Sequence, residues 1–359
     1  MAISLARGIP APECLPVEEL ADCAREALRR DGAAILSYGS TLGYAPLRDW
    51  IAQHHRVEPE RVVVTNGSLQ IFNLLLSSLR TGPVLVERPT YDRPRRILLD
   101  HGRELGEIGV DHNGLDVDEL ERDWDREGRP ALLYTIPTFQ NPTGVTLSAE
   151  RRRRLAAFVR AQDLAVLEDD PYGLVRFEGE APPSLFELEG GQHVLYSSSF
   201  SKTVAPGLRV GYAIVPAALA SELEPLVAST YITPALVAQA TLHEFLRRGL
   251  FETNLERVCG LLRERRDAML EALELSLGGR ASWSRPEGGY FIWIELADDL
   301  DASELLVRAG EAGVTFVPGA DFGGDQNTLR LAFSYVSPAE IADGIGRLAK
   351  LVASTAAPV

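Results

Sequence analysis

The sequence has few cysteines, no long apolar run and a deficit of positive charge. Its three cysteines (Cys14, Cys23 and Cys259) and its six histidines lack paired or metal-like spacing, so we expect neither disulfides nor a metal. No stretch approaches the roughly 20 apolar residues that a membrane span requires, and no secretory signal begins the chain. The net charge of -15 disfavours nucleic acid and anionic membranes as partners. These absences predict a cytoplasmic globular protein.

The chain does contain a repeated alternation of strand-like and helix-like segments. Near-continuous apolar runs predict strands at 61–65, 84–87, 131–136, 164–169, 193–198 and 210–215, with helices at 68–80 and 148–162. Buried strands that alternate with helices are typical of an α/β fold with a largely parallel sheet covered on both faces. In the second helix, we expect Arg151–Arg154 to face water.

The sequence pattern changes after about residue 235. One long helix is predicted from Val237 to about Leu277, and it is followed by short strands and helices. A chain of 359 residues exceeds one small core and favours a large domain with a smaller companion. The predicted division is an N-terminal segment that packs with the small domain (1–37), a large domain (38–235) and a small C-terminal α+β domain that includes the long helix (236–359).

One lysine lies in a setting that a surface lysine does not require. Lys202 follows a predicted strand and is flanked by Ser199, Ser201 and Thr203. Ligand sites of open α/β sheets lie where the strands end. An amine there can form a Schiff base with an aldehyde cofactor, while the hydroxyls hold an anionic group. Taken alone, the stretch also fits an ordinary solvated loop.

Three further stretches place polar residues at the end of a strand or the start of a helix. Asn141 and Pro142 form a turn that fixes the Asn141 side chain at the end of a strand. Asp169 ends another strand, where a buried carboxylate is costly unless it meets a cation or a protonated ring nitrogen. Gly67 and Ser68 begin a helix whose free N–H groups suit a phosphate. Each stretch also fits a simple turn or cap.

In chain order, these motifs resemble those of fold-type-I pyridoxal 5′-phosphate (PLP) enzymes, specifically the class I and II aminotransferases. The sequence is most similar to the branch of 2-aminoadipate (LysN-like) aminotransferases and the aminotransferase-like domains of MocR-type regulators. The motifs extend from residue 3 to about 334: ISLARGIPAPECLP, GYAPLRDWI, VTNGSLQ, FQNPTG, EDDPYG, SSSFSKTVAPGLRVGY, RPEGGYFIWIEL and NTLRLAFS. The resemblance implies a PLP-binding large domain with a mostly parallel seven-stranded sheet, and a smaller α+β domain.

The resemblance also implies roles for residues around the cofactor. Lys202 forms the Schiff base with PLP and moves the substrate Cα proton, and Asp169 pairs with the protonated pyridine nitrogen. Asn141 and Tyr172 bind the 3′-oxygen of the ring, and Tyr91 stacks on it. The implied phosphate-binding residues are Gly67, Ser68, the Leu69 amide, Ser199, Ser201 and Arg209.

Other residues are implied at the substrate and at a subunit interface. Arg330 binds the substrate α-carboxylate beside Asn141, and Gly8 lets the backbone approach it. Arg7 replaces a small residue that is usual before this glycine, and we hypothesise that it lines the substrate mouth and contacts a polar or acidic side chain. Tyr44 reaches the phosphate of the neighbouring subunit, so we expect a homodimer.

The leading interpretation is an aminotransferase that transfers an α-amino group between an L-amino acid and a 2-oxo acid. Its ping-pong mechanism passes through pyridoxamine phosphate. The same residues also suit elimination, cyclisation or oxidation of a non-proteinogenic amino acid, and a non-catalytic PLP-sensing domain is a third interpretation. The sequence identifies neither the amino donor, the oxo acceptor nor the pathway.

Overall fold

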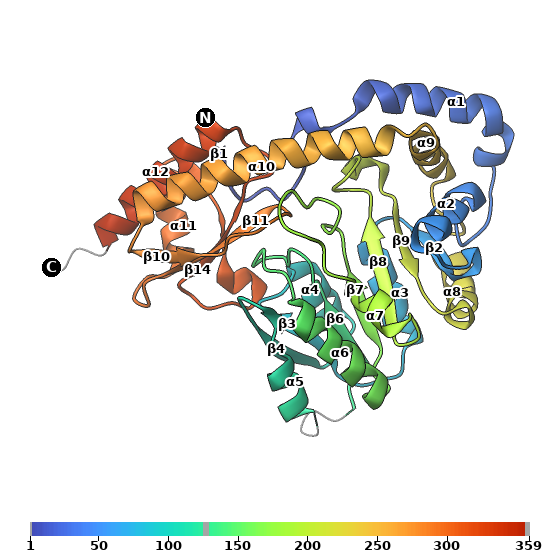
Figure 1. Ribbon diagram of the computed structural model, residues 1–359, viewed down its shortest axis with the longest axis horizontal. Helices are drawn as coiled ribbons and strands as arrows, with labels where there is room; N and C mark the ends of the chain where they lie inside the picture. The colour runs from blue at the N-terminus through green and yellow to red at the C-terminus, as the bar shows by residue number, and fades with distance from the viewer. Residues whose placement is uncertain (1, 125–128, 356–359) are drawn as a thin grey trace.

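The computed structural model describes residues 2–124 and 129–355. The first residue of the predicted N-terminal segment and residues 356–359 of the predicted small domain lie outside the described residues. Figure 1 shows a larger part built on a sheet and a smaller part, joined along one edge by a long helix. The strands of the larger sheet are β2 (Val62–Thr65), β3 (Val84–Arg88), β4 (Leu105–Asp111), β5 (Gly114–Leu115), β6 (Leu132–Thr135), β7 (Val166–Asp169), β8 (Val194–Ser199) and β9 (Gly211–Ile214).

The sheet has the strand order β2-β9-β8-β7-β6-β3-β4-β5. Its central pairs are parallel, whereas β2, β9 and β5 pair antiparallel, so the prediction of a mostly parallel sheet is confirmed. It has eight strands rather than seven because β5 folds back on β4 at one edge. The apolar runs did not predict β4, since this strand is only partly buried and carries two glycines and Glu107.

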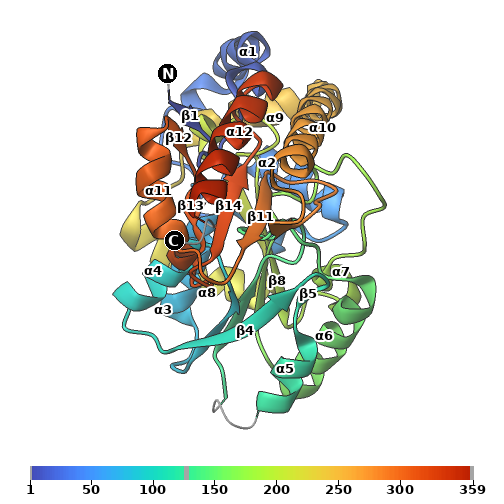
Figure 2. The ribbon, with the colours of Figure 1, turned by 90° about the vertical axis from the view of Figure 1, so that its left-hand side faces the viewer.

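Helices cover both faces of this sheet, as Figures 1 and 2 show. They are α2 (Ala45–His55), α3 (Ser68–Ser78), α4 (Asp92–Asp100), α5 (Val117–Asp123), α6 (Ala149–Gln162), α7 (Leu185–Glu189) and α8 (Ala217–Thr230). The predicted helices 68–80 and 148–162 are confirmed as α3 and α6. Ser148 caps α6, because its side chain accepts a hydrogen bond from the Arg151 amide.

The expectation that Arg151–Arg154 all face water is wrong at Arg152. This side chain is 1% exposed, and it lies on the same face of α6 as the buried Leu155. Its guanidinium donates to the carbonyl oxygens of Leu147 (2.9 Å) and Pro137 (2.7 Å). The helix is thereby tied to both ends of the loop that contains Asn141.

The predicted long helix is two helices, α9 (Leu236–Arg247) and α10 (Leu250–Leu277). Gly249 separates them with a φ of 68°, a left-handed conformation that glycine adopts readily. The small part then follows, with β10 (Ala281–Trp283), β11 (Phe291–Leu296), α11 (Ala302–Glu311), β12 (Val314–Thr315), β13 (Val317–Pro318), the 3₁₀ turn η4 (Gly319–Phe322), β14 (Thr328–Ala332) and α12 (Pro338–Thr355). Strands β10, β11, β14 and β13 form an antiparallel sheet in that order.

The first residues of the chain contact two different regions. Strand β1 (Ile3–Ser4) pairs with β12 of the small part, and the Ala332 amide donates to the Leu5 carbonyl at 2.7 Å. Helix α1 (Val17–Ile35) packs instead along α9 (Figure 1). The N-terminal segment therefore crosses from the small part to the outer end of α10. The domain boundaries at 37 and 235 stay predictions.

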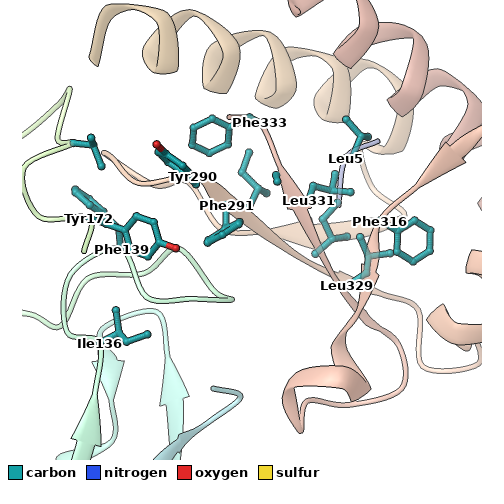
Figure 3. Packing of buried hydrophobic residues seen from close by; sticks show 14 of the residues in the cluster. Leu5, Ile136, Phe139, Tyr172, Tyr290, Phe291, Phe316, Leu329, Leu331 and Phe333 are labelled. Carbon is teal, nitrogen blue, oxygen red and sulfur yellow. The ribbon is translucent and has the colours of Figure 1, made fainter. Parts of the chain in front are cut away.

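The two parts share an apolar core. Figure 3 shows Phe139 and Tyr172, from loops that follow strands of the large sheet, close to Tyr290 and Phe291 of the small part, with Ile136 nearer the sheet. All five side chains are less than 5% exposed. Because the interior of a protein is closely packed, the loops at this junction are held in place from both sides. Over the described residues, no helix is long and apolar enough to cross a membrane.

Candidate active site

A cavity of about 550 Å³ lies where the carboxyl ends of β6, β7 and β8 face the small part. Residues of the N-terminal segment complete its wall. Most of the predicted site residues line it: Gly8, Gly67, Ser68, Leu69, Tyr91, Asn141, Asp169, Tyr172, Ser199, Ser201, Lys202, Arg209 and Arg330. The structure thus brings together residues that lie more than 300 positions apart in the sequence.

Lys202 lies in the loop directly after β8. Its Nζ donates a hydrogen bond to the Gly8 carbonyl oxygen at 2.8 Å and lies over the rings of Tyr172 and Tyr290. Desolvation, with smaller contributions from Arg330 and Arg209, lowers the pKa of Lys202 to about 8. At pH 7 about one tenth of the amine is therefore neutral, far more than for an ordinary lysine, and the neutral amine is the nucleophilic form.

Asp169 is the last residue of β7 and is 5% exposed. Its Oδ2 accepts a hydrogen bond from the Tyr134 hydroxyl at 2.8 Å, whereas its Oδ1 has no partner among the described residues. Burial raises the pKa of Asp169 to about 7, and hydrogen bonds donated to it, chiefly by Tyr134, act in the opposite direction. A protonated ring nitrogen would satisfy Oδ1 and return the carboxylate to its charged form.

Arg330, in β14, lies on the opposite wall. Its Nη1 donates to Asn141 Oδ1 at 2.7 Å, and its Nη2 donates to the Ala6 carbonyl oxygen at 3.1 Å. The guanidinium lies 4.1 Å from the centre of the Phe291 ring and 4.7 Å from that of Phe322. Burial lowers the pKa of Arg330 to about 10, so the side chain stays charged at neutral pH. Because Asn141 accepts through its oxygen, its NH₂ group remains available as a donor.

The predicted phosphate-binding residues share one wall at the start of α3. A Cβ on Gly67, which has a φ of 95°, would clash with the Arg209 guanidinium. That guanidinium donates to the Asn66 carbonyl oxygen at 3.0 Å. On the adjoining strand, the Ser199 hydroxyl donates to Ser201 Oγ at 2.8 Å. Hydroxyls, an arginine and a helix N-terminus thus converge on a site suited to an anion.

Three other predicted residues also border the cavity. Burial raises the pKa values of Tyr91 and Tyr172, so both hydroxyls stay protonated and able to donate. Tyr172 is held by edge-on packing against Phe291. Gly8 approaches the same ring so closely that a Cβ would lie 2.6 Å from Phe291 Cζ. The absence of a side chain at Gly8 therefore allows the N-terminal segment to lie against β11.

The structure does not bring two predicted residues into this cavity. Arg7 is exposed, and its guanidinium lies over the ring of Tyr335, 5.1 Å from its centre. It is absent from the lining, so this conformation does not place it at the substrate mouth. The Tyr44 hydroxyl donates to Asp31 Oδ2 at 2.5 Å, away from the cavity of its own chain.

Several lining residues were not predicted from the sequence. They are Ile9, Asp92, Arg93, Ile136, Pro171, Pro206, Phe291, Val317, Asp321 and Phe322. The motif RPEGGYFIWIEL contained Phe291, but an aromatic residue in a strand gives no sign of whether it faces a core or a cavity. Tyr134, which contacts Asp169, was not predicted for the same reason, because it lies within the apolar run 131–136.

These residues fit the three parts of PLP. The anion-binding wall at α3 suits its phosphate, the partly neutral amine of Lys202 suits its aldehyde, and the unpartnered Asp169 Oδ1 suits its ring nitrogen. Fold and site together define a PLP-dependent enzyme with the α/β transferase architecture. The family described as aminotransferase class I and II matches residues 4–348, and the chain belongs to this family.

Named relatives agree with this assignment. The chain is 41% identical to 2-aminoadipate transaminase of Thermus thermophilus, over 97% of this chain and 89% of the relative. It is 35% identical to aromatic-amino-acid aminotransferase 1 of Thermococcus litoralis, over 98% and 88% of the two chains. The crystal structure of LysN, an α-aminoadipate aminotransferase of Thermus thermophilus complexed with N-(5′-phosphopyridoxyl)-L-leucine, superposes with a TM-score of 0.93 at 39% identity, covering 98% of this chain and 92% of the other. The protein is a PLP-dependent aminotransferase, which acts between amino acids and 2-oxo acids.

Proposed function

We propose that Lys202, Asp169 and Arg330 carry this transamination, each at a different part of the bound reactants. The observation that carries the proposal is that the Lys202 amine, a buried carboxylate oxygen of Asp169 without a partner among the described residues, and the Arg330 guanidinium line the same cavity. PLP, when bound, supplies an aldehyde and an electron-accepting ring that makes the substrate Cα proton acidic.

Lys202 has two tasks in this proposal. As a neutral amine it would hold the cofactor covalently, and as a free amine it would remove and return the proton at the substrate Cα. The hydrogen bond to the Gly8 carbonyl keeps Nζ on the side of the cavity that Arg330 also faces. Asp169 keeps a proton on the ring nitrogen, and the Asn141 amide and the Tyr172 hydroxyl donate to the 3′-oxygen.

Arg330 binds the substrate α-carboxylate. Its two hydrogen bonds go to neutral oxygens of Asn141 and Ala6, and the structure records no ion pair for it among the described residues. A buried guanidinium without a counter-charge favours an anionic ligand, and the rings on either side restrict its orientation. Gly8 leaves room for this carboxylate beside the N-terminal segment.

The phosphate and the ring of the cofactor are assigned to the remaining wall. Ser199, Ser201 and Arg209 bind the phosphate together with the first N–H groups of α3, at Gly67, Ser68 and Leu69. Tyr91 precedes α4 and covers one face of the ring. We assign no substrate contact to Arg7, because its guanidinium lies over Tyr335.

We also propose a cytoplasmic homodimer in which Tyr44 reaches the phosphate of the neighbouring subunit. Leu36 and Tyr38, shortly before Tyr44, expose 71% and 78% of their surface, which favours burial against a second copy. The cysteines are free, as expected in a reducing compartment. Sedimentation of the holoenzyme tests the dimer, and weaker PLP binding by Tyr44→Phe, without loss of dimer, tests the role of this hydroxyl.

The proposed function is tested with the PLP-loaded protein and a panel of L-amino acids without an oxo acid. Pyridoxamine phosphate should form in amounts equal to the active sites, and adding a 2-oxo acid should convert it back to PLP. Lys202→Ala provides the blank. Release of an elimination or oxidation product without pyridoxamine phosphate would refute transamination. Bound PLP that responds to no amino acid would favour a sensing role.

A further inference from the structure

The Oδ2 atom of Asp169 accepts a hydrogen bond from a buried tyrosine. Tyr134 lies in β6, and its neighbour in register on β7 is Leu167, two residues before Asp169. The Tyr134 hydroxyl donates to Asp169 Oδ2 at 2.8 Å. Oδ1 has no partner among the described residues, so the two oxygens of one carboxylate differ in their surroundings.

The ring of Tyr134 has little freedom to move. Its side chain is 1% exposed, and it packs edge-on against Phe72 with 5.1 Å between ring centres. Phe72 lies on α3, the helix whose first turn forms the phosphate wall. The direction of the hydroxyl is therefore set by the same helix that is assigned to the far end of the cofactor. An aromatic side chain fixed in this way loses little further entropy in holding its hydrogen bond.

The charges around the pair favour one arrangement of protons. Burial raises the pKa of Tyr134 well above its usual value, so this hydroxyl stays protonated and can donate to Asp169. Asp170 and Glu87 both raise the pKa of Asp169, whereas hydrogen bonding from Tyr134 and, to a smaller extent, from Ser68 lowers it. Tyr91 and Tyr172 also lie within its electrostatic reach and stay neutral. Tyr134 is thus a group that favours the ionised form of Asp169 against two like charges.

We infer that Tyr134 is a positioning residue, whose hydroxyl fixes Asp169 Oδ2 so that Oδ1 alone faces the ring nitrogen of bound PLP. This inference rests on the proposed role of Asp169 and adds the residue that orients it. Without the hydroxyl, the carboxylate can rotate about its χ2 and is less able to remain charged. The pKa of the ring nitrogen then decreases, and the substrate Cα becomes less acidic.

The chain offers a matched control one residue away. The Tyr196 hydroxyl donates to Asp170 Oδ2 at 3.0 Å, and Tyr196 is 8% exposed in the neighbouring strand β8. Asp170 does not line the cavity. Tyr134→Phe and Tyr196→Phe therefore each remove one buried hydroxyl from one buried carboxylate. Only the first change removes a hydrogen bond from the carboxylate that is assigned to the cofactor.

The test measures the ring nitrogen directly, in both variants loaded with PLP labelled with ¹⁵N in the ring. In Tyr134→Phe, the pH midpoint at which the ¹⁵N resonance reports loss of the ring proton should fall by about one unit or more, since a hydrogen bond to a charged group is lost. The kcat should decrease about 10- to 100-fold with little change in KM, as is found for residues that orient a ligand-binding side chain through a hydrogen bond. Tyr196→Phe should leave both values within about twofold of the unmodified protein.

Equal midpoints in the two variants would refute the inference. If the unmodified protein binds PLP but does not transaminate, the proposed function fails, while the ¹⁵N comparison still tests Tyr134. If Tyr134→Phe does not fold, Phe72→Leu keeps the hydroxyl and removes the ring that packs against it. That variant should shift the midpoint in the same direction by a smaller amount, and no shift would again count against a positioning role.

Discussion

The two walls of the active-site cavity are built in different ways. The wall on the large part comes from neighbouring strand ends of one sheet, and two of its polar groups are partnered within the large part, Asp169 Oδ2 by Tyr134 and Ser199 by Ser201. The opposite wall comes from the N-terminal segment and β14, and it connects to the first through Arg330 with Asn141 and Lys202 with Gly8. In the proposed function, the first wall binds the cofactor and the second, with Arg330, binds the substrate.

The most severe test of this division is Lys202→Ala. The activity should decrease at least about 10⁴-fold, because the variant loses both the covalent attachment and the proton transfer at Cα. PLP should still bind through the phosphate wall, but without the visible absorption of the attached cofactor. The chain contains one other lysine, Lys350, which is exposed on α12, and Lys350→Ala provides the control. Persistent covalent attachment in Lys202→Ala would contradict the assignment.

Arg330→Lys tests the opposite wall. Lysine cannot match the two-pronged geometry of a guanidinium, so kcat/KM for amino acids should decrease about 10²-fold. The absorption spectrum and the affinity for PLP should change little, because those depend on the other wall. Arg96→Lys, at an exposed ion pair on α4, is the control. A loss of PLP affinity as large as the loss in kcat/KM would show that cofactor binding and substrate binding are not separated between the two walls.

The smallest expected effect concerns pH. The rate at which the apoenzyme attaches PLP should rise about tenfold per unit below pH 8 and level off above it, since only the neutral amine reacts. The direction follows from Lys202, whose pKa of about 8 lies below the usual value of 10.5. Stopped-flow absorbance between pH 6 and 10 measures this rate. If the rate of PLP attachment continued to increase up to pH 10, Lys202 would behave as an ordinary solvated lysine, which would contradict its proposed role as the nucleophile.

Sequence reasoning located the residues of the cavity best where they lie at or just after the end of a strand. Lys202, Asp169 and Asn141 each come directly or shortly after an apolar run, and parallel strands bring their ends to one edge of the sheet. It failed where the burial of a side chain depends on the face of a helix, and where a break within a helix was not predicted. Arg152 is buried by its place on α6, and Gly249 divides the predicted long helix. The exposed position of Arg7 over Tyr335 also depends on contacts distant in sequence.

The sequence by itself determined the family and the α/β architecture, because apolar runs and motifs can be read directly along the chain, and it predicted candidates for the chemistry. Only the tertiary structure decided how those residues are held. Tyr134 is one apolar-strand residue among several until β6 lies beside β7 and its hydroxyl meets Asp169. Gly8 and Arg330 likewise gain their neighbours only when the N-terminal segment and β14 close over the large sheet.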